Sequence, residues 1–176
     1  MRTIRMITTG LASLALLTGT AFGATAQSPE AMAPAWVTGQ VFYGTQLSVP
    51  AVTTEDGVTH KRGESYVDQR WDISDSRLSG MAVAAWNSDV HELPDGTGVS
   101  LVAVGTYEIV NDEGTWVGGY TSTGQGADDA LGMLETVTLT GSSAYEGLFA
   151  VLNLDWTTYP VPVEGMIILG ELPPSP

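Results

Sequence analysis

Hydrophobic and polar residues alternate, or form short apolar runs, from Trp36 onward, and no stretch carries the stripe of an amphipathic helix. Glycine, proline, asparagine and aspartate separate these segments, as turns require. The pattern predicts eight β-strands, at residues 36–43, 64–73, 78–86, 100–110, 114–122, 134–140, 146–154 and 163–171. The polar segments 44–62 and 123–129 are expected to be longer connections.

Eight antiparallel strands in one domain have to hide their edges, and closing the sheet on itself removes those edges altogether. Glycines inside the predicted strands, such as Gly80, Gly105 and Gly118, favour the sharp bends of a barrel wall. We therefore expect an all-β fold, a single closed antiparallel barrel of about eight strands, in which residues 37–42 pair with residues 166–169. A β-sandwich is the alternative architecture.

The N-terminus has the three parts of a secretory signal peptide. Arg2 and Arg5 precede an uncharged apolar segment, and Ala24-Thr-Ala26 supplies the small residues that signal peptidase reads. Threonine and glycine dilute the apolar segment, which is short for a spanning helix of about 20 residues, so a membrane anchor is the weaker alternative. We predict cleavage after Ala26 and a secreted or periplasmic location. The expected organisation is a signal peptide at 1–26, a flexible leader at 27–35 and one domain at 36–174.

The chain is strongly acidic, with Asp+Glu 20 against Lys+Arg 6 and a formal net charge of −14. Removal of Arg2 and Arg5 with the predicted signal peptide leaves a domain that is more acidic still. Such a charge repels nucleic-acid phosphates and anionic membrane surfaces, so neither is an expected partner, and no second hydrophobic span follows the signal peptide. Solubility outside the cell is the simplest explanation of the acidity. Neutral, apolar or cationic partners are compatible with it, and the oligomeric state is not defined.

One candidate for chemistry is the predicted strand 64–73. Strict alternation places Tyr66, Asp68, Arg70 and Asp72 on one face. Enclosed in a barrel, these charges would have shifted pKa values, which makes Asp68, Arg70 and Asp72 candidate catalytic residues. The alternative is a solvated outer face with weak ion pairs, each contributing at most about 1 kcal/mol.

A second candidate combines aromatic and small residues. Trp116, Gly118 and Tyr120 share one predicted strand face, and Ala84 and Trp86 share another with Gly80 and Ala82. Small residues beside rings leave room for an apolar ligand in a barrel lumen, or they pack a solid core. The candidate ligand-binding residues are Trp86, Trp116, Tyr120, Ala84 and Gly118.

No motif for a metal, a cofactor or a nucleophile is present in the sequence. The two histidines, His60 and His91, lie in polar segments without zinc-binding spacing, and the acidic pairs lack the spacing of a calcium loop. The chain has no G-x-S-x-G elbow, and the absence of cysteine excludes disulfides. We expect no metal and no cofactor.

Two segments near the C-terminus, Gly141-Ser-Ser-Ala-Tyr-Glu-Gly-Leu148 and Gly165-Met-Ile-Ile-Leu-Gly170, resemble the closing strands of the allene oxide cyclase and dirigent-like barrel. Asp75-Ser-Arg-Leu-Ser-Gly80 and Gly114-Thr-Trp-Val-Gly118 are similar to segments of exported bacterial proteins of unassigned function. The resemblance implies an eight-stranded closed sheet with a largely apolar lumen, which in plants cyclises or steers reactive intermediates. It places no catalytic residue of that family on this chain.

The expected function is therefore binding of a small apolar or aromatic molecule, or of a protein partner, by an exported acidic barrel. Catalysis is not favoured, because the sequence shows no nucleophile, metal site or acid–base pair. The alternative is a cyclase- or isomerase-type enzyme that holds a hydrophobic substrate in a low-dielectric lumen. The direction in which Asp68, Arg70 and Asp72 point distinguishes the two functions.

Overall fold

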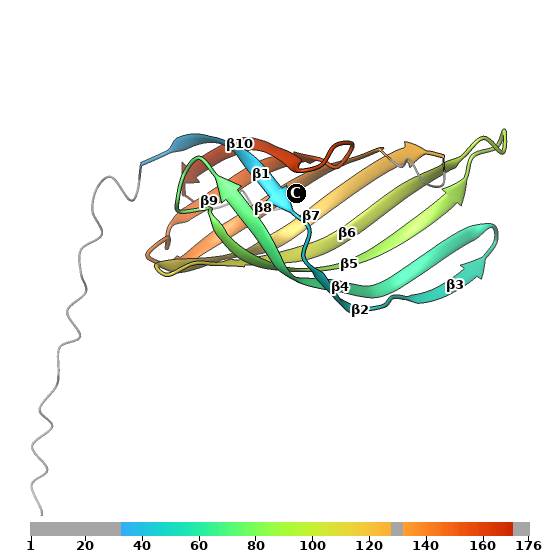
Figure 1. Cartoon of the computed structure of the whole chain (residues 1–176), viewed down its shortest axis with the longest axis horizontal. Coiled ribbons are helices and arrows are strands. Elements are labelled where there is room, and N and C mark those ends of the chain that lie inside the picture. Colours follow the sequence, from blue (N-terminus) through green and yellow to red (C-terminus); the bar gives the residue numbers. More distant parts are fainter. Residues whose placement is uncertain (1–32, 128–131, 171–176) are drawn as a thin grey trace, which may run out of the picture.

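The computed structural model describes residues 33–127 and 132–170, and every regular element in these ranges is a β-strand. The predicted signal peptide at 1–26, most of the leader and the last residues of the predicted domain lie outside them. The ten strands (Figure 1) are β1 (Ala35–Phe42), β2 (Thr45–Ser48), β3 (Ala51–Glu55), β4 (Val58–Ile73), β5 (Gly80–Glu92), β6 (Val99–Val110), β7 (Gly114–Gly126), β8 (Gly132–Ser143), β9 (Leu148–Asp155) and β10 (Val161–Leu169).

All ten strands belong to one antiparallel sheet, and eight of them form a hydrogen-bonded ring. Pairing runs from β1 through β10, β9, β8, β7, β6, β5 and β4 and returns to β1. Both sides of β1 are used, with Val37 opposite Gly165 of β10 and Val41 opposite Trp71 of β4. The prediction of an all-β fold with about eight strands in a closed sheet, the first paired with the last, is confirmed. The partner segment in β10 is 161–167, slightly earlier than expected.

The segment 44–62 is not the long connection that its polarity suggested. It forms β2, β3 and the beginning of β4, and both short strands pair with β4. Asp56 and Gly57 have positive φ values of 51° and 78°, which fit the tight two-residue turn between β3 and β4. Every residue of β3 is exposed, so the polar composition of this hairpin reflects its contact with solvent.

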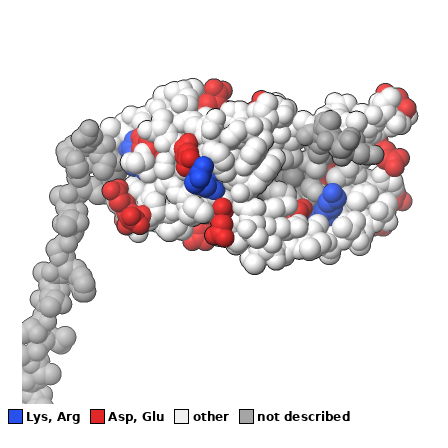
Figure 2. All heavy atoms as spheres, viewed as in Figure 1, with Lys and Arg blue, Asp and Glu red and all other residues white. Residues whose placement is uncertain are grey.

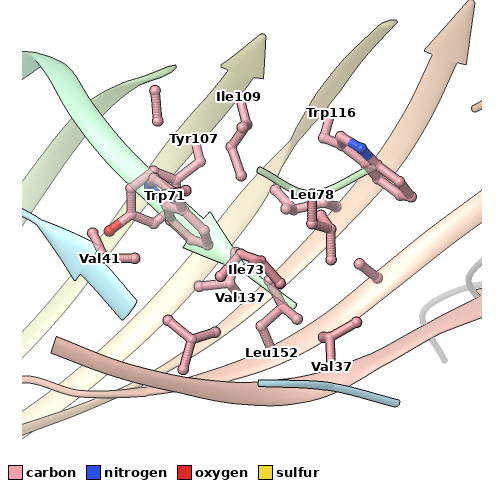
Figure 3. Packing of buried hydrophobic residues seen from close by; sticks show 14 of the residues in the cluster. Val37, Val41, Trp71, Ile73, Leu78, Tyr107, Ile109, Trp116, Val137 and Leu152 are labelled. Atoms are coloured by element: carbon pink, nitrogen blue, oxygen red, sulfur yellow. The ribbon is translucent and has the colours of Figure 1, made fainter. Parts of the chain in front are cut away.

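Inward-facing side chains of the ring strands form one hydrophobic core. In Figure 3 the Trp71 ring lies against Tyr107, with the ring centroids 5.2 Å apart in an edge-to-face arrangement. One end of the ring is closed by the segment between β4 and β5, whose Leu78 is fully buried. Trp116 anchors this segment, because its Nε1 donates a hydrogen bond to the Arg77 carbonyl oxygen at 2.7 Å.

The other end of the ring is built differently. Strands β4 to β8 contain 12 to 16 residues each, whereas β1, β9 and β10 contain eight or nine. The long strands therefore run past the β9–β10 turn, towards the right in Figure 1, where β1, β9 and β10 do not extend. We call this the open end.

Candidate functional site

A cavity of about 270 Å³ lies against the inward faces of the long strands near the open end. We call it the inner chamber. Its lining combines carboxylates, one cation, hydroxyls and apolar groups from five strands. The lining residues are Lys61 and Glu64 of β4, Trp86 and Ser88 of β5, Leu101 and Ala103 of β6, Tyr120 and Ser122 of β7, and Met133 and Glu135 of β8.

Two β-bulges in β4 decide which of its residues reach the inner chamber. The register against β5 shifts between Lys61 and Glu64 and again between Tyr66 and Gln69. A bulge inserts one extra residue, which reverses the side on which the following residues lie. Tyr66 is opposite Ala84 and Gln69 is opposite Ala82, and both of these alanines are buried inside the ring. Tyr66 and Gln69 thus share the inner side although they are three residues apart.

Glu64 is held by three hydrogen-bond donors. Its carboxylate accepts hydrogen bonds from Trp86 Nε1 at 2.7 Å, from the Tyr66 hydroxyl at 2.9 Å and from Gln46 Nε2 at 2.9 Å. Burial, followed by the contact with Glu64, raises the pKa of Tyr66 to about 12, so this hydroxyl stays protonated and remains a donor. The arrangement fixes the Trp86 ring in the chamber wall and ties β2 to it.

Glu135 is the second carboxyl group and is almost completely enclosed, with 3% of the residue exposed. The Tyr107 hydroxyl donates a hydrogen bond to Glu135 Oε1 at 2.9 Å. Burial raises the pKa of Glu135 to about 7, against the opposing influence of Tyr107 and of the nearby Trp156 indole. At neutral pH Glu135 is therefore divided between its protonated and ionised forms.

The Tyr120 hydroxyl is buried without a hydrogen-bond partner, and only 5% of the residue is exposed. Burial raises the pKa of Tyr120 far above its usual range, and the charges of Glu135 and Glu64 add to this effect. Gln69 Oε1 and Trp71 Nε1, further along β4, are also buried and unpartnered. Buried polar groups are normally paired, and each one left without a partner costs about 1–3 kcal/mol.

An aromatic stack stands at the turns next to the open end. Tyr43, after β1, lies parallel to Tyr159 of the β9–β10 turn, with centroids 4.8 Å apart, and it also stacks on Trp156 at 5.7 Å. Tyr43 and Tyr159 are each 57% exposed. The Trp156 Nε1 atom is buried and lies near Glu135 without reaching hydrogen-bonding geometry. Trp156 thus connects the exposed stack with the enclosed carboxyl group.

The predicted ligand-binding residues fall into two groups. Trp86 and Tyr120 line the inner chamber. Trp116 and Ala84 are fully buried in the core, and a Cβ on Gly118 would overlap the carbonyl oxygen of Thr138. The second group therefore packs the fold and does not face the cavity.

The charged residues predicted as catalytic candidates lie on the outer face. Asp68, Arg70 and Asp72 are exposed, and Asp68 has a positive φ of 58° at the second bulge. Arg70 Nε is 3.2 Å from Asp72 Oδ1, and the Arg70 guanidinium lies 4.0 Å from the centre of the Phe42 ring. The structure therefore shows the solvated alternative and not an enclosed charged cluster. These three residues are therefore no longer candidates for catalysis inside the sheet.

Sequence reasoning missed the two carboxyl groups that the chamber does contain. Glu135 belongs to the inward-facing set of β8, together with Met133, Val137 and Leu139. One acidic residue in an otherwise apolar alternation is a signal that the sequence carries. Glu64 gave no such signal, because strict alternation groups it with the exposed Arg70 and Asp72, and the bulge between Tyr66 and Gln69 turns it inward.

A larger hollow of about 730 Å³ lies on the outer face, across β7, β8, β9, β10 and β1. Exposed threonines, Asn153 and Glu164 dominate its surface, and Thr136 Oγ1 donates a hydrogen bond to Asn153 Oδ1 at 3.1 Å. None of its lining residues has a buried, unpartnered side-chain atom. The inner chamber is therefore the better candidate site.

Neither a metal site nor a known relative indicates what the chamber binds. Within residues 33–127 and 132–170, no group of three or more His, Asp or Glu side chains is placed to hold a metal ion. The same ranges contain no helix with the length and apolar character of a membrane span. A scan against protein-family models and searches of curated proteins and of solved structures found no match to the chain.

Proposed function

We propose that this protein binds a small, largely hydrophobic or aromatic molecule in the inner chamber and acts as a binding protein. The observation that carries the proposal is Tyr120, a residue in the wall of a cavity of about 270 Å³, whose buried hydroxyl lacks a hydrogen-bond partner. A ligand in the cavity would supply the missing hydrogen bond.

The chamber lining has the usual composition of a small-molecule site. Such sites are mainly apolar, with a few polar groups that fix the orientation of the ligand. Leu101, Ala103 and Met133 supply aliphatic surface, and Trp86 supplies a ring that Glu64 holds in place. The volume of about 270 Å³ lies just below the usual range of about 300–1,000 Å³, which favours a ligand of few atoms.

Two sequence features support the same proposal. The resemblance to the allene oxide cyclase and dirigent-like barrel implies a ligand inside a closed sheet. The tripartite N-terminal pattern supports secretion as part of the proposed role, so that the ligand is met outside the cytoplasm. A protein partner, the other expected ligand, has no comparable set of unpartnered buried groups on the outer face of the described residues.

A cyclase- or isomerase-type enzyme is the second candidate, and one observation favours it. Glu135 has a pKa of about 7 and a hydrogen bond from Tyr107 in an enclosed site. A carboxyl group with this pKa is suited to exchange protons near neutrality. Chemical conversion of a bound compound, followed by NMR, would support this function, whereas release of the unchanged compound supports simple binding.

The binding proposal is tested with phenethyl alcohol as a neutral aromatic probe, by calorimetry and ligand-observed NMR. We expect saturable binding, which Leu101→Trp abolishes by filling the chamber. Val102→Trp is the matched control, because Val102 is the next residue and is 50% exposed on the outer face. Absence of saturable binding at millimolar concentration, or equal binding by the two variants, would contradict the proposal.

A further inference from the structure

Some polar groups around the inner chamber form hydrogen bonds within the protein, and others do not. Tyr66, Trp86 and Gln46 donate their hydrogen bonds to Glu64, and Tyr107 donates to Oε1 of Glu135. These aromatic and amide donors are therefore already used. The groups left over in the lining are the Lys61 ammonium, the Ser88 and Tyr120 hydroxyls and several unfilled acceptors.

The unfilled acceptors lie on β5, β7 and β8. They include the second oxygen of Glu135, the lone pairs of the Tyr120 hydroxyl and the hydroxyl oxygens of Ser88 and Ser122. Tyr120 and Ser122 are on β7, and Ser122 is directly opposite Glu135 in the β7–β8 pairing. A ligand that complements this wall has to bring several hydrogen-bond donors to one point.

The electric charge of the site favours a cation. Glu64 and Glu135 line the chamber with one cationic side chain, Lys61, and neither carboxylate has an ion pair among the described residues. The chain as a whole carries a formal charge of −14, and Figure 2 shows acidic side chains spread over the visible face with few basic ones. A field of this sign concentrates cations near the open end.

The aromatic lining adds a second source of attraction. Trp86 and Tyr120 line the chamber, and the ring of Tyr66 lies 5.1 Å from that of Trp86. The faces of tryptophan and tyrosine rings attract ammonium groups, most strongly where water is excluded. Carboxylates and aromatic faces around one cavity are the combination that recognises organic ammonium ions.

We propose that the inner chamber selects organic cations, small molecules in which a protonated amine is attached to a hydrophobic or aromatic body. The ammonium group donates hydrogen bonds to Glu135 and Tyr120, and the body lies against Leu101, Ala103 and Met133. This inference rests on the proposed binding function and narrows the class of ligand.

Binding of an amine is linked to the protonation of Glu135, because only the ionised carboxylate attracts the cation. The titratable groups around Glu135 are Lys61, Glu64 and Tyr120, which line the chamber with it, and Tyr107, which donates a hydrogen bond to it. Burial raises the pKa values of both tyrosines well above their ordinary range, so they stay neutral near pH 7. His60 points to the outer side of β4, where its Nδ1 lies 2.7 Å from Asp89 Oδ1. Among these groups, Glu135 has a pKa of about 7 and titrates in this range.

The test compares three probes with similar bodies and different charges: phenethylamine, phenethyl alcohol and phenylacetate. At about pH 8 we expect the amine to bind at least about tenfold more tightly than the alcohol, as a hydrogen-bonded charge pair implies, and phenylacetate to bind most weakly. Below about pH 7 the affinity for the amine should fall by up to about tenfold per pH unit, while the affinity for the alcohol stays constant.

Glu135→Gln removes the charge and keeps an acceptor for the Tyr107 hydroxyl. In this variant the amine should lose its advantage over the alcohol and its pH dependence. Glu108→Gln is the matched control, because it removes the same charge from an exposed position on β6. Lys61→Gln removes the repelling cation of the chamber and should leave the affinity for the amine equal or higher. If Glu135→Gln does not fold, the pH series on the unmodified protein decides.

The outcomes separate this inference from the binding proposal. Equal binding of amine and alcohol, tightest binding of phenylacetate, or amine binding that Glu135→Gln does not alter would each overturn the cation inference and leave the binding function standing. Failure of all three probes to bind would overturn both.

Discussion

Replacement of Glu135 by glutamine should stabilise the protein at alkaline pH. Burial raises the pKa of Glu135 from the ordinary 4.5 to about 7. Each pKa unit corresponds to about 1.4 kcal/mol of free energy, so the ionised side chain lowers the stability of the fold by roughly 3 kcal/mol. Glutamine has the same shape and stays neutral, which removes this cost while Tyr107 keeps an acceptor.

The sign follows from the protonation of the two states. Below pH 4.5 the group is protonated in both the folded and the unfolded chain, so its contribution does not depend on pH. Between 4.5 and about 7 the unfolded chain loses its proton while the folded protein keeps it, so stability falls as the pH rises. Above about pH 7 the loss is complete. Glu135→Gln should therefore be more stable than the unmodified protein by roughly 3 kcal/mol at about pH 8, and by no more than about 1 kcal/mol at about pH 5.

Urea denaturation followed by tryptophan fluorescence measures both proteins across this pH range. Asp75, Asp89, Asp95 and Asp155 do not interfere, because their pKa values are lowered from 3.8 and they titrate below the range. Glu108→Gln controls for the loss of one negative charge and should show a constant difference. Parallel stability curves for Glu135→Gln and the unmodified protein would refute the reasoning, since they would mean that Glu135 ionises equally easily in the folded and unfolded states.

Two further predictions concern the frame around the site. Gly118→Ala should lower the free energy of unfolding by about 1–3 kcal/mol, because the new methyl group meets the backbone oxygen of Thr138. Gly119→Ala is the control and should change the free energy of unfolding little, because the nearest atom to its new methyl group is 3.5 Å away. Thermal denaturation of the two variants checks this prediction. Asp75→Asn should cost about 3 kcal/mol, since Arg77 loses the carboxylate charge that it contacts at 2.6 Å and 2.9 Å. The Arg77 hydrogen bond lowers the pKa of Asp75. The difference in unfolding free energy between Asp75→Asn and the unmodified protein should therefore persist above about pH 4 and shrink at lower pH, where Asp75 is protonated. Equal stability of the two proteins at neutral pH would contradict this prediction.

The closed sheet was predictable because alternation and edge protection are properties of whole strands. Apolar residues at every second position identify β6, β7, β8 and β10, and turn residues separate them. In a closed sheet every strand is hydrogen-bonded to a neighbour along both of its edges. The pairing of the first strand, β1, with the last, β10, therefore follows from closure of the sheet. Exposed hairpins give no such pattern, which explains why β2 and β3 were expected to be a loop.

The candidate site was not predictable to the same degree, because it depends on two single-residue insertions. Strict alternation through 64–73 places Tyr66 with Asp68, whereas the bulge at Asp68 separates them and turns Tyr66 inward. Aspartate tolerates a positive φ better than most residues, but nothing else in its sequence context marks the position. Gly63, with a φ of 76°, is the clearer sign of the first bulge.

These bulges also explain why the site has this chemistry. Without the second bulge Glu64 would face solvent together with Arg70 and Asp72, and the chamber would hold one carboxyl group, with Trp86 lacking its acceptor. With this bulge, Glu64 lines the chamber from β4 and its hydrogen-bond donors are in place. Glu135 lines the chamber from β8, and the burial of its ionised carboxylate lowers the stability of the protein. A glutamine at 135 would avoid that cost and keep the Tyr107 hydrogen bond. The presence of an acid at this position is therefore better explained by the proposed binding of a cation than by what the fold requires.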